Sequence, residues 1–358
     1  MRRITPNYIK EGMVVGQEVY DNYGNLLIGY GTELTNKHRR LLLANEVPEI
    51  FIEDPRTEDV VVAPLFPLHQ IGKLANAYRT FIEETRLNRS INKRSVEQMC
   101  ITINTIIKDI SLKVVGEVDV SHIPLKDFLY LQPIKTAMLS IALGRKLGIA
   151  RNELSQLGIA ALFKDIGFLL YPAEVVLQAI TEDSIDSKLK EHPQLGSKIL
   201  SQIQATSGTV ATSVLQHHEC WNGKGYPAGL KGKDISMFAR IIYISDCFVN
   251  LLVDRPAQER YMTHQVIEYV MAYSGELFSP ELVETFVRLI PCYTTGQTVA
   301  LNTGETGVVS NSNLGFVARP VVRIIRDAAN QDVEEPYDID LAKPEYQNML
   351  ITKVLEYD

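Results

Sequence analysis

Three histidines lie close together in the sequence and could bind a metal ion. His192 precedes the adjacent pair His217 and His218, so three of the seven histidines fall within 27 residues. On a helix, neighbouring side chains point about 100° apart, so the pair could serve one ion or two adjacent ions. A lone histidine in such surroundings is more often a satisfied core residue. The three together favour a metal site.

Two aspartates stand in apolar, helix-like segments and need partners there. Asp165 follows the run Ala160–Phe163 and Lys164, and Asp246 ends the run Ile241–Ser245. A buried carboxylate without a partner is costly. For either aspartate alone, a salt bridge or a helix cap is the ordinary explanation. Beside the histidine cluster, both become candidate metal ligands.

A glycine-rich bend follows the histidine pair directly. Residues 221–227 read Trp-Asn-Gly-Lys-Gly-Tyr-Pro and contain the only tryptophan of the chain. Gly223 and Gly225 would let the backbone approach a ligand closely. The bend is therefore a candidate ligand-binding element.

The elements that position these residues are predicted to be helices. From about residue 67 to 290, apolar residues recur every three or four positions, as in Ile103, Ile106, Ile107 and Ile110. The two ends of the chain instead show strand signals. Residues 14–20 and 26–29 flank a turn cluster, a helix is expected from Thr35, and residues 49–53 form a closing strand. Three further β-rich runs are predicted at 298–301, 307–309 and 320–325.

The predicted organisation is mainly α, an all-α helical domain flanked by small β-rich regions. The expected boundaries are 1–56 for a β-rich N-terminal domain, 57–124 for a linker and leading helices, 125–290 for the helical domain and 291–358 for a β-rich C-terminal region. A chain of 358 residues suggests two or three domains.

Composition excludes several classes of protein. Forty-three acidic against 36 basic residues give a net charge of −7, which argues against a dedicated nucleic-acid binder. The four cysteines show no CxxC spacing, so neither a disulfide framework nor a zinc ribbon is expected. No run is long enough to span a bilayer, and no signal peptide is recognisable. A cytoplasmic location is expected.

Several of these segments together resemble the HD-GYP domain family. Residues 217–227, His-His-Glu-Cys-Trp-Asn-Gly-Lys-Gly-Tyr-Pro, resemble its signature. Residues 191–196 are similar to its second metal-binding block, and Ile244–Asp246 with Asp254–Pro256 to its last. Lys164–Gly167 falls where the name-giving His-Asp pair belongs. The resemblance covers residues 125 to 275.

The resemblance implies an all-α phosphohydrolase that hydrolyses cyclic di-GMP at two or three metal ions, often iron or manganese. It assigns metal binding to Asp165, His192, His217, His218 and Asp246, with Asp165 as the bridging ligand. It assigns ligand binding to Gly225, Tyr226, Pro227 and Arg255. Paired metals would hold the attacking hydroxide and neutralise the developing charge.

This chain departs from that pattern at specific positions. Lys164 replaces the histidine of the His-Asp pair, and Gln132 replaces an upstream metal-binding histidine. Positions where the family carries other functional side chains hold Phe128, Phe168 and Gln258. We expect a reduced centre of iron, manganese or zinc, with one ion or none favoured over two or three. In our hypothesis Lys164 takes the place of one metal and pairs with Asp246 or Asp165.

The functional interpretation is a degenerate HD-GYP signalling protein, weakly active or inactive, that responds to a nucleotide or works through protein contacts. The alternative is an active metal-dependent phosphodiesterase that hydrolyses cyclic di-GMP with a reduced metal site. A scaffold built on the β-rich ends is a third class. Candidate partners are cyclic di-GMP or a related nucleotide, signalling proteins and a second copy of the chain. Nucleic acid and membrane are not expected.

Overall fold

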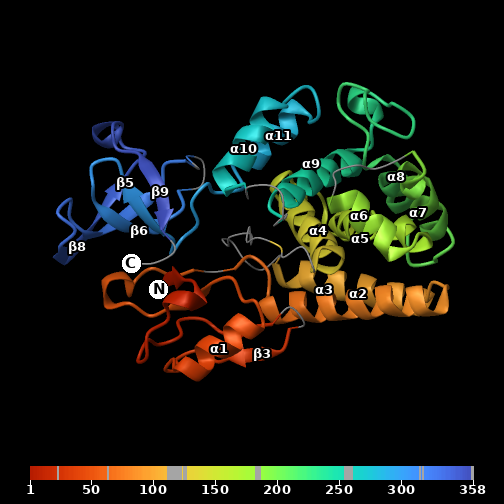
Figure 1. Ribbon diagram of the computed structural model, residues 1–358. Coiled ribbons are helices and arrows are strands. Elements are labelled where there is room, and N and C mark those ends of the chain that lie inside the picture. The colour runs from red at the N-terminus through yellow and green to blue at the C-terminus, as the bar shows by residue number, and fades with distance from the viewer. Residues whose placement is uncertain are drawn as a thin grey trace. The chain divides into compact units, whose positions relative to one another are not determined.

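The computed structural model divides into two compact units. It describes residues 1–21, 24–62, 64–110, 123, 127–181, 187–253, 261–313, 316 and 318–355. Residues 65–114 and 118–289 form a helical unit. Residues 1–64 and 290–358, the two ends of the chain, belong to a second, β-rich unit. Figure 1 shows the helices and strands of both units. The expected mainly α fold with β-rich flanks is confirmed.

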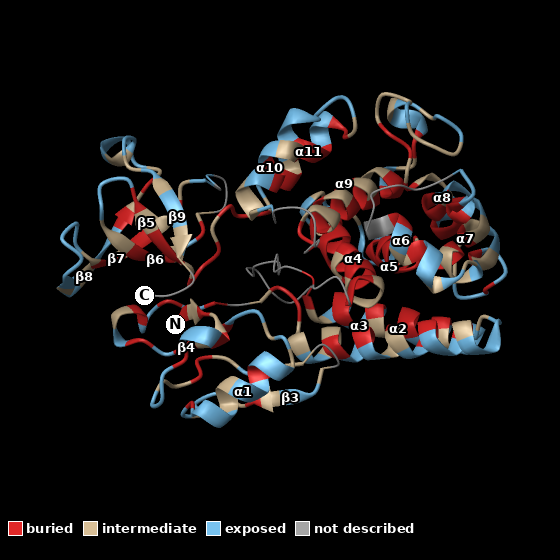
Figure 2. Ribbon diagram, viewed as in Figure 1, coloured by how far each residue is buried: buried red, intermediate tan, exposed pale blue. Residues whose placement is uncertain are grey.

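The helical unit is built around α4 (Phe128–Lys146), which packs on α5 (Arg151–Leu162) and α9 (Met237–Leu251). Residues on every side of α4 are buried, as expected of a helix in the middle of a core (Figure 2). Gly158 of α5 allows this close packing, because a Cβ there would lie 2.6 Å from Cδ1 of Ile141. The other helices are α2 (Leu68–Asn88), α3 (Lys93–Ile110), α6 (Ala173–Thr181), α7 (His192–Leu200), α8 (Gly208–Gln216), α10 (Thr263–Ala272) and α11 (Pro280–Val287).

The predicted apolar face of α3 is confirmed, since Ile103, Ile106, Ile107 and Ile110 are fully buried. Short 3-10 turns connect several helices of this unit, at Ile166–Leu170, Leu189–Glu191 and Gly232–Asp234. Within the part of the chain that the structure describes, no helix is both long and apolar enough to cross a membrane.

The N-terminal part of the β-rich unit has its own small core. Strand β1 (Arg2–Ile4) pairs with β4 (Ile50–Ile52), and β2 (Val19–Tyr20) pairs with β3 (Leu26–Ile28), both antiparallel. Helix α1 (Asn36–Ala44) begins after Thr35, whose side chain caps it together with His38. The predicted hairpin, helix and closing strand are therefore confirmed. Two 3-10 turns, Pro6–Tyr8 and Pro55–Thr57, flank them.

The C-terminal part forms an antiparallel sheet in the order β8-β7-β6-β5-β9. The predicted runs correspond to β5 (Thr298–Leu301), β6 (Thr306–Asn311) and β7 (Val321–Arg326). Sequence analysis missed both edge strands, β8 (Asp332–Asp340) and β9 (Ile351–Leu355), and a 3-10 turn at Pro344–Tyr346. Val299, Val309, Val322 and Ile324 are fully buried in the core of this sheet.

The two ends of the chain contact each other directly within this unit. The amide of Arg3 donates to the carbonyl of Gly296 over 2.7 Å, which extends the contacts of β1. Arg323 of β7 binds Asp59 through two hydrogen bonds of 2.8 and 2.9 Å. The same guanidinium binds Asp338 of β8, so one arginine joins the sheet to the N-terminal region.

Candidate metal centre

Four side chains converge in the interior of the helical unit. Asp165 lies in the turn after α5, His192 begins α7, and His217 and His218 follow the last residue of α8. One potential ligand atom of each lies within 4.8 Å of those of the others. Oδ1 of Asp165 is 3.3 Å from Nε2 of His192 and 3.5 Å from Nε2 of His217. Nε2 of His192 is 3.4 Å from that of His217 and 3.2 Å from that of His218.

Backbone carbonyls fix the orientation of two of these rings. Nδ1 of His192 lies 2.7 Å from the carbonyl of Leu189, and Nδ1 of His217 lies 2.6 Å from that of Val214. A carbonyl oxygen only accepts hydrogen bonds, so each Nδ1 carries the proton. In the neutral rings the Nε2 lone pairs then face each other, and a cation between them would relieve their repulsion. Metal-binding histidines are commonly held in this way, so the residues fit a divalent ion.

The surroundings keep the site ready to bind a cation. Burial lowers the pKa of His192, although Asp165 opposes the shift. Burial and the neighbouring histidines place the pKa of His218 well below its usual range. Burial alone would raise the pKa of Asp165, but the charge of Lys164 and the adjacent His192 and His217 hold it well below the ordinary value. A carboxylate beside neutral imidazoles is a donor set that suits zinc, iron or manganese.

Lys164 is buried beside this cluster and bonds to two carboxylates. Its side chain is 2% exposed, and Nζ is 2.8 Å from Oδ1 of Asp246 and also contacts Oδ2 of Asp165. Burial alone would lower the pKa of Lys164, but the two aspartates raise it, so the ammonium stays charged. From the sequence, Lys164 was expected to pair with Asp246 or Asp165. In the structure it forms an ion pair with each of them. Asp246 lies outside the group of four ligand candidates.

Gln132 completes the surroundings of Asp246. From α4, its Nε2 donates to Oδ1 of Asp246 and to Oδ1 of Asn250, the latter over 3.2 Å. Two positions where the resemblance expects metal-binding histidines thus hold Lys164 and Gln132, and both side chains donate to Asp246. The carboxylate of Asp246 is therefore supplied with donors from both of these positions.

Aromatic rings cover two of the histidines. Phe168 stacks on His192 with ring centroids 3.9 Å apart, and Tyr226 stacks on His218 at 4.7 Å. Lys190 lies 5.7 Å from the centroid of the Tyr226 ring. Phe168 therefore contributes an apolar wall beside His192. Arg255 and Gln258 lie outside the described residues, so the structure does not place them.

The expectation that the histidine pair lies on a helix is wrong. Helix α8 ends at Gln216, and His217 and His218 occupy the turn that follows it. Their ring centroids lie 4.1 Å apart with planes inclined by 43°. The turn lets both Nε2 atoms face His192, which the 100° spacing of helical neighbours would not predict.

The sequence did not reveal that Glu219 and Gly225 hold the backbone around the site. Glu219 is 1% exposed, and its carboxylate accepts hydrogen bonds from the amides of Ala228 and Leu230 at 2.7 and 2.9 Å. A Cβ on Gly225 would lie 2.3 Å from the amide nitrogen of Cys220. Glu219 and Gly225 therefore fold the glycine bend back onto the histidine turn. Pro227 follows Tyr226 in the same bend through a cis peptide bond.

Gly167 has a similar role on the opposite side of the cluster. A Cβ at this position would lie only 2.1 Å from the carbonyl oxygen of His192. The lack of a side chain lets the turn after Asp165 approach the start of α7, where His192 is located. The resemblance includes Gly167 in the segment Lys164–Gly167, but the sequence does not reveal its contact with His192.

Comparison with known families agrees with this geometry. A family model described as an HD domain matches residues 122–282, which include Asp165 and all three histidines. Residues 122–282 are therefore similar to HD domains. A second family model, described as a KOW domain associated with HD domain, matches residues 298–357. That match covers the five-stranded sheet of the β-rich unit.

Curated relatives of this region are named as phosphodiesterases of cyclic dinucleotides. A cyclic di-GMP phosphodiesterase of Pseudomonas aeruginosa is 27% identical over 61% of this chain and 52% of its own length. A cyclic di-GMP phosphodiesterase response regulator of Xanthomonas campestris is 35% identical over 40% of this chain and 38% of its own. A 3′3′-cGAMP-specific phosphodiesterase of Vibrio cholerae is 30% identical over 43% and 30%. The chain thus spans about half or less of these relatives.

Proposed function

We propose that this protein is a degenerate HD-GYP signalling protein that holds one divalent ion and binds a cyclic dinucleotide, with weak hydrolysis or none. The observation that carries the proposal is how Asp165 uses its two oxygens. Oδ1 faces His192 and His217, whereas Oδ2 binds the ammonium of Lys164. One oxygen of the carboxylate that would bridge two metals is therefore already bound to the ammonium of Lys164.

Electrostatics support a single ion. Lys164 places one positive charge between Asp165 and Asp246, and Gln132 satisfies Asp246 with an amide. A second divalent ion at Asp246 would have to displace a buried ammonium or lie next to it. Like charges in contact inside a protein repel by several kcal/mol. The three histidines and Oδ1 of Asp165 remain available for one ion.

The arrangement limits the chemistry that the centre can support. A bound divalent ion would lower the pKa of a water ligand and so supply a hydroxide. Hydrolysis of a phosphodiester also requires neutralisation of the charge that develops on the phosphate oxygens. Lys164 is fully engaged with two carboxylates, and Phe168 offers no charge. Binding of the nucleotide is therefore favoured over its turnover.

The names of the relatives support a cyclic dinucleotide as the ligand. Two act on cyclic di-GMP and one on 3′3′-cGAMP. In this chain, Gly225, Tyr226 and Pro227 lie in the bend beside His218, and we propose that they contact the nucleotide together with Arg255. Tyr226 keeps its phenol proton, because burial and Asp165 raise its pKa.

Metal content and hydrolysis measured together test the proposal. We expect about one manganese or iron ion per chain in protein purified without chelator, binding of cyclic di-GMP and little product. Two or more ions with turnover would establish the alternative, an active phosphodiesterase with a reduced site. No ion under iron- or manganese-rich conditions would contradict the metal half.

A matched set of variants makes the test sharper. The double variant Lys164→His with Gln132→His restores the two histidines that the resemblance expects, and we expect it to bind a second ion. Lys146→His adds a histidine at an exposed position of the same helix α4 and should leave one ion. An unchanged metal content in the double variant would contradict the role assigned to Lys164.

A further inference from the structure

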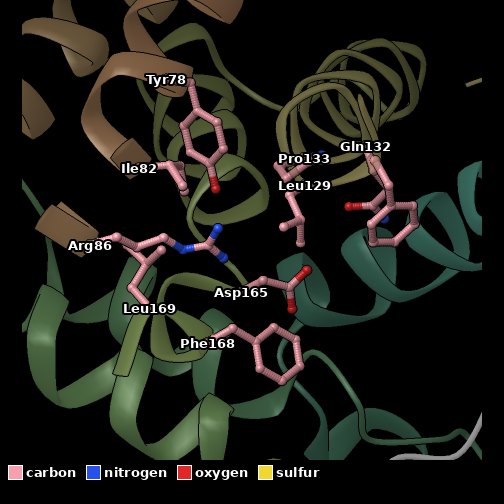
Figure 3. Close-up of a pocket in the computed structure, with 10 residues that line it drawn as sticks. Tyr78, Ile82, Arg86, Leu129, Gln132, Pro133, Asp165, Phe168 and Leu169 are labelled. Atoms are coloured by element: carbon pink, nitrogen blue, oxygen red, sulfur yellow. The ribbon is translucent and has the colours of Figure 1, made fainter. Parts of the chain in front are cut away.

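A pocket opens beside the metal centre and is walled in part by α2, which precedes the HD-domain match. Asp165, Phe168 and Gln132 line it on the side of the centre. Tyr78 and Arg86 line it from α2. Figure 3 shows the guanidinium of Arg86 and the hydroxyl of Tyr78 pointing into the space above Asp165. Residues outside the matched domain thus help to shape its site.

Arg86 is the one cation among the residues that line this pocket, and its charge is not neutralised there. Its Nε is buried and has no hydrogen-bond partner. Among the described residues, no carboxylate forms an ion pair with Arg86, although Asp165 lines the same pocket and pairs with Lys164 instead. A buried donor without a partner is costly. A ligand with hydrogen-bond acceptors would give Nε of Arg86 a partner.

Tyr78 adds a second donor at the same place. Burial and the charge of Asp165 raise its pKa, so the hydroxyl stays protonated. The pocket therefore offers two donors close to the metal centre, one of them charged. An anion with several acceptor oxygens suits this arrangement, because guanidinium groups bind phosphate through paired hydrogen bonds.

We propose that Arg86 and Tyr78 form a phosphate-binding subsite beside the metal centre. The subsite supplies the positive charge that Phe168 lacks, but from another helix. It deepens the proposed function, because it would hold one phosphate of the cyclic dinucleotide. Phosphate binding itself does not depend on which nucleotide carries it. The two claims can therefore be tested separately.

The experiment measures binding of inorganic phosphate and of cyclic di-GMP to the full chain by calorimetry. Arg86→Gln removes the charge, and Arg86→Lys keeps a charge without the planar fork. Arg79→Gln is the matched control, since Arg79 is on the same helix but pairs with Glu83 and lies over Tyr130. We expect Arg86→Gln to weaken phosphate binding at least tenfold, Arg86→Lys to weaken it less, and Arg79→Gln to change it less than twofold.

The outcomes separate the subsite from the proposed function. Phosphate and cyclic di-GMP affinities that are unchanged in Arg86→Gln would overturn the subsite, as would the absence of phosphate binding to the wild-type chain. Phosphate binding that depends on Arg86 without any binding of cyclic di-GMP would support the subsite and contradict the proposed ligand. Tyr78→Phe is the second variant, and a loss smaller than that of Arg86→Gln is expected.

Discussion

Two clusters of the same kind, a cation between two carboxylates, occur in the two units of this protein. Lys164 lies between Asp165 and Asp246, with exposed fractions of 2% for the lysine and 5% for Asp246. Arg323 lies between Asp59 and Asp338, whose side chains are 69% and 41% exposed. The first cluster is in the core beside three histidines. The second joins β7 and β8 to a turn of the N-terminal region at the surface.

Burial, rather than the type of contact, decides how much an ion pair contributes to stability. Exposed pairs contribute about 0–1 kcal/mol each, because water solvates the separated charges nearly as well. Removing one partner of a buried pair costs roughly 3–5 kcal/mol, because a charge is left in the interior. The buried cluster therefore constrains the site, while the exposed one adds little to stability.

The largest expected effect comes from breaking the buried cluster. Lys164→Met removes the ammonium at similar volume and leaves two carboxylates facing each other. We expect a loss of about 3–5 kcal/mol in the free energy of unfolding of the helical unit. The only tryptophan, Trp221, lies in this unit, so its fluorescence in urea reports the change. Adding Asp246→Asn should recover part of the loss, and a loss below 1 kcal/mol would make the two clusters equivalent.

A second test concerns the ion that the histidines are expected to hold. Manganese at a hundred times its dissociation constant should stabilise the wild-type chain by about 2.7 kcal/mol relative to chelated protein. His192→Ala should abolish this gain, since its Nε2 faces both other histidines. His69→Ala removes an exposed histidine of the same unit and is the control. Equal gains in both variants would mean that the ion binds elsewhere.

Acid provides a smaller test within the β-rich unit. Burial opposes ionisation of Asp54, but hydrogen bonds from Arg56 and the charges of Arg56 and Arg2 lower its pKa to about 2. Its contribution is complete above pH 4 and is lost as the pH falls through 2. Because Arg56 is partly exposed, we expect about 1 kcal/mol. Asp54→Asn should therefore lower stability at pH 7, and the difference from wild type should shrink near pH 2.

The smallest effect is expected for the exposed cluster itself. Arg323→Gln removes the bonds to Asp59 and Asp338 but leaves no charge in the interior. We expect less than about 1 kcal/mol, and 1 M salt should reduce that further. Hydrogen exchange of residues 298–355, read by mass spectrometry, isolates the β-rich unit. A loss as large as that of Lys164→Met would refute the distinction between the clusters.

Local patterns in the sequence predicted those parts of the fold that local rules decide. The buried face of α3 followed from its periodicity, and the β2–β3 hairpin from its turn residues. Strand β8 escaped because it is an edge strand, mostly exposed and rich in acidic residues, so it shows no apolar alternation. The order of strands in the sheet depends on packing, which no local pattern encodes.

The candidate site likewise contains residues that the sequence predicts and contacts that only packing decides. The three histidines, Asp165 and Lys164 could be recognised from the sequence, because they stand in short segments that follow one another in the order of the family's blocks. The contact between Gln132 and Asp246 requires α4 to pack on α9, 114 positions apart in the chain. Arg86 belongs to no motif and reaches the pocket only because α2 packs against the turn after Asp165.

The joining of the two chain ends in one unit has a consequence for biosynthesis. The amide of Arg3 bonds to Gly296, which the ribosome adds 293 residues later. At about 5–20 residues per second, β1 waits roughly 15–60 s for this partner. During that time one strand edge of the nascent chain stays open, and open edges pair readily with other chains. The helical unit, encoded in between, can complete its folding first.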